Sequence, residues 1–383
     1  MMCVGWATAE PAPVATSNVE TSTADKSTPD TTTVKKSFLK KVSDFFSLDG
    51  GGTPSNPSRV SVIGGPYYES VSGLGISAVA ASSFRLKGCD STQQSSNVLL
   101  SGSITTKKFW DVMLKGNLVL PGHDFRINYL LDFEYLPSYY WGIGYENGNN
   151  PENKTQQPKH DAVVRLDMLF NLAEGLHFGP VVQWNYMNSA AIDRPELLDG
   201  QDRILRHYGF GAAIQYDTRD LITDAKSGCY LYLSQMIRPK FLWNKYAFST
   251  TEFKASYYHT LWRDASLAAE LCGTFNFGSP SWDMMAQVGD RYRMRGYYTG
   301  RYRDKHMWTT QVELRQHIWH RHGVVLWVGG GNIFHDSASF KHFLPNFGVG
   351  YRFEFRRRTN IRLDFGFAKG SQCGFMFNIN EAF

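Results

Sequence analysis

The sequence lacks long apolar runs, a strong charge of either sign and a cysteine framework. No apolar run approaches the ~20 residues that a membrane-spanning helix needs, so a helical membrane protein is excluded. The 40 Lys and Arg residues nearly balance the 35 Asp and Glu residues and form no basic stripe, so we expect no nucleic-acid partner. The 5 cysteines have no metal-ligand spacing, so we predict neither a metal nor another cofactor.

Aromatic residues and glycine are abundant instead. Phe, Tyr and Trp make up 15% of the 383 residues, Gly occurs 35 times, and hydrophobic residues reach only 42%. Such a mixture arises when strands alternate between a face that meets lipid and a face that meets water. The length alone would suggest two soluble domains, but this composition makes a transmembrane β-barrel a serious alternative.

The first 58 residues differ in composition from the rest of the chain. Residues 1–9 combine a short apolar piece with an Ala-x-Ala pattern that a signal peptidase could cut, and we interpret them as the remnant of a signal peptide. Residues 10–58 predict a flexible periplasmic tether, because much of this segment is Ser, Thr and Pro and cannot bury a core. Within it, residues 35–48 predict a short amphipathic helix, which packs on the protein itself or docks on a membrane surface or partner.

From residue 59 onward the hydrophobic pattern has a period of two. In segment 125–135 every odd position is apolar, while the even positions include Arg126, Asp132 and Glu134. One face of such a strand is apolar and the other is charged. A soluble β-sandwich also alternates, so this pattern alone does not separate a sandwich from a membrane barrel.

Turn signals divide the remaining chain into sixteen candidate strands. Most are near or above the ~9–11 residues that cross a bilayer at a tilt. The predicted strands are 59–68, 73–85, 96–105, 108–119, 124–134, 161–171, 174–187, 205–217, 228–238, 249–260, 264–277, 307–318, 323–334, 344–356, 359–368 and 373–383.

The connections between these strands sort by parity. Loops after odd strands include the long segments 135–160, 188–204, 278–306 and 335–343, whereas most connections after even strands are short turns. A sandwich has no reason to sort its loops in this way. We therefore predict an all-β fold, a sixteen-stranded antiparallel transmembrane β-barrel over residues 59–383.

The longest loop carries a specific motif. Its segment Met294-Arg295-Gly296-Tyr297 resembles the [VLM]-R-G-[FY] signature of the BamA/TamA-type outer-membrane barrels, also called the bacterial surface antigen superfamily. This resemblance implies that the long extracellular loop 278–306 folds into the lumen.

Three further segments match the same superfamily in order along the chain. Residues 216–220 and Gly228 resemble its periplasmic turn after the eighth strand, residues 328–334 its thirteenth strand, and residues 362–383 its last two strands. The residues carried over are Asp217, Arg219, Asp220 and Gly228 at the turn, and Phe375, Phe377 and the terminal Phe383 as the C-terminal strand signal.

The resemblance also assigns roles within the loop. Arg295 is expected to carry the charge of the plug, Gly296 to permit a tight turn, and Tyr297 to pack against the wall. The expected lumenal partner of Arg295 is Glu313, whose parity on its strand points inward.

Two departures from the superfamily pattern stand out. Strand thirteen has Gly329 or Gly330 where many relatives carry a second acid, so we expect the Arg295 site to have lost one carboxylate. Only about 58 residues precede the barrel, which is too short for a POTRA domain, and we expect the barrel-only branch of the superfamily.

An enzymatic function has little support in the sequence. His317, His320 and His322 cluster near a predicted hairpin, where a solvated turn is favoured over a metal site. Gly329–Gly331 lacks the Lys-Ser/Thr of a phosphate-binding loop. We therefore predict no catalytic residues.

The expected protein is an integral barrel of the bacterial outer membrane with both termini in the periplasm. By resemblance it takes part in outer-membrane protein assembly or translocation. The expected partners are outer-membrane lipids, lipopolysaccharide, and assembly subunits or periplasmic proteins that contact residues 10–58. The alternative is a passive or gated diffusion channel. The seam between the first and last strands is expected to be weakly paired, because Pro66 cannot donate a ladder hydrogen bond and two glycines precede it.

Overall fold

The computed structural model describes residues 61–69, 73–89, 95–122, 125–290, 292–338, 340–356, 358–379 and 381–383. The chain divides into two units, residues 1–53 and 54–383, and every described residue belongs to the second unit. The signal-peptide remnant, the predicted tether and its amphipathic helix all lie outside the described residues.

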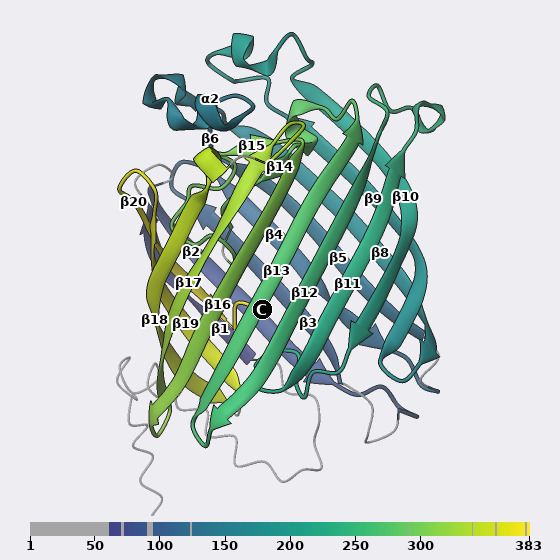
Figure 1. Ribbon diagram of the computed structural model, residues 1–383, viewed down its shortest axis with the longest axis vertical. Coiled ribbons are helices and arrows are strands. Elements are labelled where there is room, and N and C mark those ends of the chain that lie inside the picture. Colours follow the sequence, from purple (N-terminus) through teal and green to yellow (C-terminus); the bar gives the residue numbers. More distant parts are fainter. Residues whose placement is uncertain are drawn as a thin grey trace, which may run out of the picture. The chain divides into compact units, whose positions relative to one another are not determined.

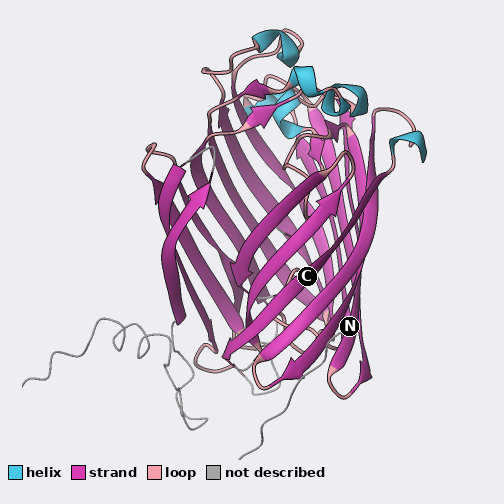
Figure 2. Cartoon of the chain, turned by 90° about the vertical axis from the view of Figure 1, so that its left-hand side faces the viewer, coloured by secondary structure: helices cyan, strands magenta, loops and turns pink. Residues whose placement is uncertain are grey.

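Sixteen strands form one antiparallel sheet whose spatial order follows the chain. The sheet curves around a lumen, and its strands run obliquely between the two ends (Figures 1 and 2). Its strands are β1 (Ser61–Glu69), β2 (Gly73–Phe84), β3 (Ser96–Thr105), β4 (Trp110–Val119), β5 (Phe125–Leu136), β8 (Lys159–Ala173), β9 (Leu176–Asn188), β10 (Ile204–Asp217), β11 (Gly228–Arg238), β12 (Phe248–Trp262), β13 (Ala265–Gly278), β16 (His306–Trp319), β17 (His322–Phe334), β18 (Leu344–Arg356), β19 (Thr359–Ala368) and β20 (Gln372–Ile379).

The predicted sixteen-stranded fold is confirmed. Strands 96–105, 228–238, 344–356 and 359–368 begin and end where the sequence placed them, and most other boundaries move by one or two residues. The last strand is the exception, because β20 ends at Ile379 and not at residue 383.

The alternating pattern places apolar side chains on the outside of the sheet. In β10, Tyr208 and Phe210 are exposed on the outer face, whereas His207 and Gln215 are buried on the lumenal face. Exposed Leu, Val and Phe side chains recur on the outer face of other strands. A soluble sandwich buries its apolar faces, so this inverted arrangement is the one expected of strands that contact lipid.

The long loops gather at one end of the barrel, at the top of Figure 1. Short turns join the strands at the other end. None of the described helices is long and apolar enough to cross a membrane. The short elements of the long loops are β6 (Tyr139–Tyr140), α2 (Tyr145–Asn149), η1 (Pro151–Asn153), β7 (Thr155–Gln156), η2 (Pro195–Leu198), η3 (Lys240–Leu242), η4 (Trp282–Met284), β14 (Ala286–Gln287), β15 (Arg303–Asp304) and η5 (Phe340–His342).

The sheet has two edges, β1 and β20. Within the residues that the structure describes, no hydrogen-bonded ladder joins these two strands. They are also the shortest of the sixteen, with 9 and 8 residues. Every other strand pairs on both sides, so the seam between β1 and β20 is the weakest line of the sheet.

The segregation of loops generates a test of orientation. We expect a cysteine at exposed Asn149 of α2 to react with a membrane-impermeant maleimide on intact cells, because the long loops should face outward. The matched variant Glu174→Cys, exposed in the β8–β9 turn, should react only after the outer membrane is breached. Both variants require a background without the native cysteines. Labelling of Glu174→Cys alone on intact cells would reverse the proposed orientation.

Candidate functional site: a plugged lumen and an unpaired seam

The loop between β13 and β16 enters the lumen and returns. Its base is a two-residue ladder in which β14 pairs with β15. At its tip, Asp290 accepts hydrogen bonds from the main-chain N–H groups of Tyr292 and Arg293. Met294 and Tyr297 are both buried, and with Val288 and Tyr302 they belong to one apolar cluster. The loop is therefore packed within the protein and does not hang free at the barrel mouth.

Arg295 is the most enclosed charge of this loop. Its guanidinium is fully buried and lies over the Trp327 ring at 3.7 Å from the centroid. Nη2 contacts a carboxylate oxygen of Glu313 on β16, and Nη1 lies 2.7 Å from a carboxylate oxygen of Asp364 on β19. An unpaired guanidinium in this position would be very unfavourable, so these two carboxylates fix the loop to the wall.

These contacts belong to a larger set of buried charges, which we call the charge ring. Glu313 also pairs with Arg315 at 2.9 Å, and Asp364 pairs with Arg352 at 2.6 Å. Glu381, which follows β20, closes the ring because it contacts both of these arginines. The charge ring comprises Arg295, Glu313, Arg315, Glu381, Arg352, Asp364 and Arg362.

The expectation that Arg295 had lost its second carboxylate is wrong. Strand β17 indeed supplies no acid at Gly329 or Gly330, but Asp364 reaches the guanidinium from β19, two strands away. The alternating pattern of the sequence already placed the Asp364 side chain on the inner face, together with Arg362. The expectation failed because it looked for the second acid only on the strand where relatives carry it.

A close backbone approach explains the glycine after Arg295. Gly296 has φ +108, and a Cβ there would lie 2.8 Å from the main chain of Gly366 on β19. Gly366 is itself paired with Gly348 on β18 and Gly374 on β20. A Cβ at Gly366 would meet the Arg295 carbonyl and one at Gly374 would meet the Gly296 main chain, so these two glycines leave a recess in the wall for the loop's backbone.

Tyr297 fastens the loop on its other side. Its hydroxyl donates to the carbonyl of Pro345 at 2.7 Å and accepts from the main-chain N–H of Lys369. Burial raises the pKa of Tyr297 above its ordinary value, so the phenol stays protonated and remains a donor. The side-chain amide of Asn346 donates to the Arg295 carbonyl, which adds a hydrogen bond from the wall to the loop backbone.

The turn between β10 and β11 is built on the second motif. Asp217 accepts two parallel hydrogen bonds from Arg219, each 2.9 Å long, and the Arg219 guanidinium lies over the Tyr230 ring. Asp220 pairs with Arg358 from the β18–β19 turn at 2.6 Å. Gly228 has φ +95, and a Cβ there would lie 2.2 Å from the Thr218 carbonyl oxygen, so only glycine fits.

The C-terminal segment departs from the predicted strand. Phe375 and Phe377 are exposed on the outer face of β20, but Phe383 is buried. The chain leaves the sheet after Ile379, and Glu381 binds Arg352 inside the lumen. The prediction of a last strand over residues 373–383 is therefore wrong at its end, because the ion pair with Arg352 holds Glu381 away from the sheet.

Groups that could suggest catalysis have structural partners. His317 contacts the His320 carbonyl oxygen, and no described residues form a group of three His, Cys, Asp or Glu side chains that could hold a metal ion. His207, Asp283 and Ser281 form a buried cluster that the sequence did not predict. Asp283 and Ser281 approach the same nitrogen of His207, whereas a catalytic triad places them on opposite nitrogens.

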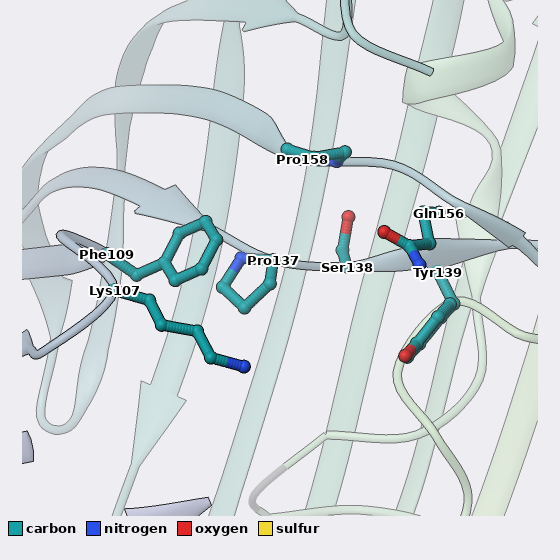
Figure 3. A pocket seen from close by; sticks show the side chains of 7 residues that line it. All are labelled: Lys107, Phe109, Pro137, Ser138, Tyr139, Gln156 and Pro158. Atoms are coloured by element: carbon teal, nitrogen blue, oxygen red, sulfur yellow. The ribbon is translucent and has the colours of Figure 1, made fainter. Parts of the chain in front are cut away.

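A shallow cavity of about 280 Å³ lies at the end of the long loops, and Arg295 is not among the residues that line it (Figure 3). It lies between the β3–β4 hairpin and the segment that carries β6 and β7. Its lining combines aromatic, proline and polar side chains: Lys107, Phe109, Pro137, Ser138, Tyr139, Gln156 and Pro158. Its size is at the low end for a small-molecule site.

Comparison with known proteins agrees with this architecture. The model of the Omp85 superfamily domain matches residues 138–383. The fold is similar to BamA from Haemophilus ducreyi lacking POTRA domains 1–3, with a TM-score of 0.52 and 12% identity over 85% of this chain and 69% of that chain. No curated protein matches the sequence.

Two further solved structures have the same fold. CdiB from Escherichia coli matches with a TM-score of 0.52 and 10% identity, over 86% of this chain and 62% of that chain. CdiB from Acinetobacter baumannii gives a TM-score of 0.51 and 10% identity, over 85% and 59%. The chain thus spans about three fifths of either CdiB chain, and identities this low show similarity of fold alone.

The sixteen-stranded sheet, its apolar outer face and its inward loop define an outer-membrane β-barrel with an occupied lumen. Because the family model covers more than half of the chain, the protein belongs to the Omp85 superfamily. The resemblance to BamA-type barrels inferred from the sequence is confirmed.

The Arg295–Glu313 contact can be tested by a double-mutant cycle. We expect Arg295→Ala to lower the free energy of unfolding in detergent by about 3–5 kcal/mol, because it removes the buried cation that Glu313 and Asp364 share and leaves each acid with its remaining arginine partners only. Glu313→Gln should reproduce part of this loss, with a coupling energy of about 1 kcal/mol or more. The exposed pair Arg194 and Glu196 is the control and should give a change near zero. Simple additivity of the Arg295 and Glu313 effects would show that the contact does not act as a unit.

The recess for the plug makes a separate prediction. We expect Gly296→Ala to displace the loop and raise the single-channel conductance in planar bilayers, because the added Cβ collides with main-chain atoms of β19. Gly65→Ala on β1 is the control, since a Cβ there meets no atom within 4 Å. Equal conductance of Gly296→Ala and the unaltered protein would mean that the loop does not limit flow.

Proposed function

We propose that this protein inserts or translocates polypeptides at the outer membrane, opening laterally between β1 and β20. The observation that carries the proposal is that the two edge strands of the sheet, β1 and β20, are short and share no ladder among the described residues. Unpaired backbone groups are costly in lipid, so an incoming strand that pairs with either edge would be stabilised. Membership of the Omp85 superfamily supports this reading.

The proposal also gives the inward loop a role during opening of the seam. Arg295, held by Glu313 and Asp364, keeps the lumen occupied while the seam opens. Substrate polypeptides would then be handled at the edge strands without a permanent hole through the membrane.

We further propose an orientation and a set of contacts. The long loops face the cell exterior, where lipopolysaccharide surrounds the barrel, and the short turns face the periplasm. The apolar outer face contacts outer-membrane lipids. Residues 10–58 remain the expected contact for assembly subunits or periplasmic proteins.

A diffusion channel is the second candidate, and the lumen wall favours it. Arg165 pairs with Glu252 at 2.7 Å, and Lys254 pairs with Glu270 at 2.8 Å, so the wall is charged on several strands. Such a wall would suit water and small solutes if the loop moved. A channel would conduct through the lumen and would not need the seam.

Crosslinking of the seam distinguishes the two candidates. In a background where Cys373 on β20 is the sole native cysteine, Glu69→Cys adds a second thiol on β1, at the same end of the antiparallel sheet. The assay follows the rate at which an unfolded outer-membrane barrel polypeptide becomes protease-resistant in vesicles that contain the protein. We expect a flexible bis-maleimide between the two thiols to abolish the acceleration, because β1 and β20 can no longer separate.

The control ties strands that are already paired. Phe367→Cys on β19 is the registered partner of Cys373, and its crosslinking should leave the acceleration unchanged. Full acceleration after complete seam crosslinking would contradict lateral opening. Solute flux through the crosslinked protein, measured in the same vesicles, would then support the channel.

A further inference from the structure

After β20 the chain turns inward, and Glu381, Ala382 and Phe383 are buried in the lumen. In both Figure 1 and Figure 2 the end marked C falls within the outline of the barrel. These three residues, which we call the tail, contact side chains from β12, β13, β16, β18 and β19. In this position the tail does not lengthen β20, the edge strand of the sheet.

Two kinds of contact hold Glu381, one through its main chain and one through its carboxylate. The main-chain N–H of Glu381 donates to the Thr223 carbonyl oxygen at 3.1 Å, in the turn between β10 and β11. The Glu381 carboxylate accepts from Arg352 Nε at 3.0 and 2.8 Å and from Asn360 Nδ2 at 2.8 Å. Backbone and acid of the tail are thus both recognised.

The aromatic residue of the tail is packed in an apolar cluster. Phe383 and Ala382 pack with Tyr258 on β12, Ala268 on β13 and Ala225 in the turn. The Arg315 guanidinium lies 5.1 Å from the centre of the Phe383 ring, and its Nη2 donates to the Phe383 carbonyl oxygen at 3.1 Å. The site therefore binds a carboxylate and, two residues later in the same segment, an aromatic ring.

The two arginines of this site are positioned without the tail. Arg315 is held by Glu313 at 2.9 Å, and Arg352 is held by Asp364 at 2.6 Å. If the tail left, the charge ring would retain four arginines and only two carboxylates, Glu313 and Asp364. The empty site would be preformed and positively charged, which favours rebinding of an acidic segment.

We propose that this lumenal site is a peptide-binding site, filled in cis by residues 381–383, that accepts in trans a polypeptide segment with a carboxylate followed two residues later by an aromatic side chain. The tail of the protein itself then competes with such a segment for the site. This inference rests on the contacts of the tail and does not depend on the proposed function.

A fluorescent peptide tests the proposal. The probe is Asn-Ile-Asn-Glu-Ala-Phe, the sequence of residues 378–383, with a free C-terminal carboxylate. The protein is the full chain in detergent carrying Glu381→Gln and Phe383→Ala, which releases the tail. We expect saturable binding to this variant and binding weaker by about tenfold or more to the unaltered protein, where the tail occupies the site.

Altered peptides provide the matched controls. Replacing the peptide's Glu by Gln, or its Phe by Ala, should each weaken binding about tenfold or more, because a charge-assisted hydrogen bond or the aromatic contact is lost. If the double variant does not fold, Phe383→Ala alone is used: it vacates the aromatic part of the site while Glu381 stays paired, so it should bind the probe more tightly than the unaltered protein does. No saturable binding to a folded variant, or equal binding of all three peptides, would overturn the proposal.

Discussion

The burial of one guanidinium constrains much of this structure. Arg295 has no solvent exposure, so its charge must be matched inside the lumen by Glu313 from β16 and Asp364 from β19. Both acids point inward only in the observed register, because a slip of one residue would turn either of them toward lipid. The plug, the charge ring and the register of these strands therefore stabilise one another.

The strands themselves were largely readable from the sequence. Each strand can be predicted from its own segment of sequence, because the period of two and the turn residues that end the strand are local features. In β11 the strand opens at Gly228, where a positive φ marks the turn, and closes before Pro239, so both boundaries could be placed. The inward direction of Glu313 followed from the same parity.

Long-range partners were harder to read. Asp364 was visible as an inward acid, but nothing in its neighbourhood says that a loop 69 residues away would reach it. The tail is a stronger case, since alternation continued past Phe377 predicts an outward Phe383. Tertiary contacts with Arg352, Arg315 and Thr223 override that pattern, and they come from elements far apart in the chain.

The tail links the seam to the charge ring. Glu381 belongs to the ring, and β20, to which it is attached, is one edge of the sheet. Holding the tail inward keeps residues 381–383 out of the sheet, so they cannot extend the pairing surface of β20 toward β1. A displacement of Glu381 in the charge ring can therefore move the end of β20 at the seam, because only a short stretch of chain joins the two.

This arrangement also bears on how the protein would open. Expelling the plug would break the two ion pairs of Arg295, the hydrogen bond from Asn346 to its carbonyl and the packing of the buried Met294. Separating β1 from β20 breaks no ladder among the described residues. Local opening follows the path on which the fewest interactions are lost. For that reason we favour the lateral route, with the plug in place, over conduction through the lumen.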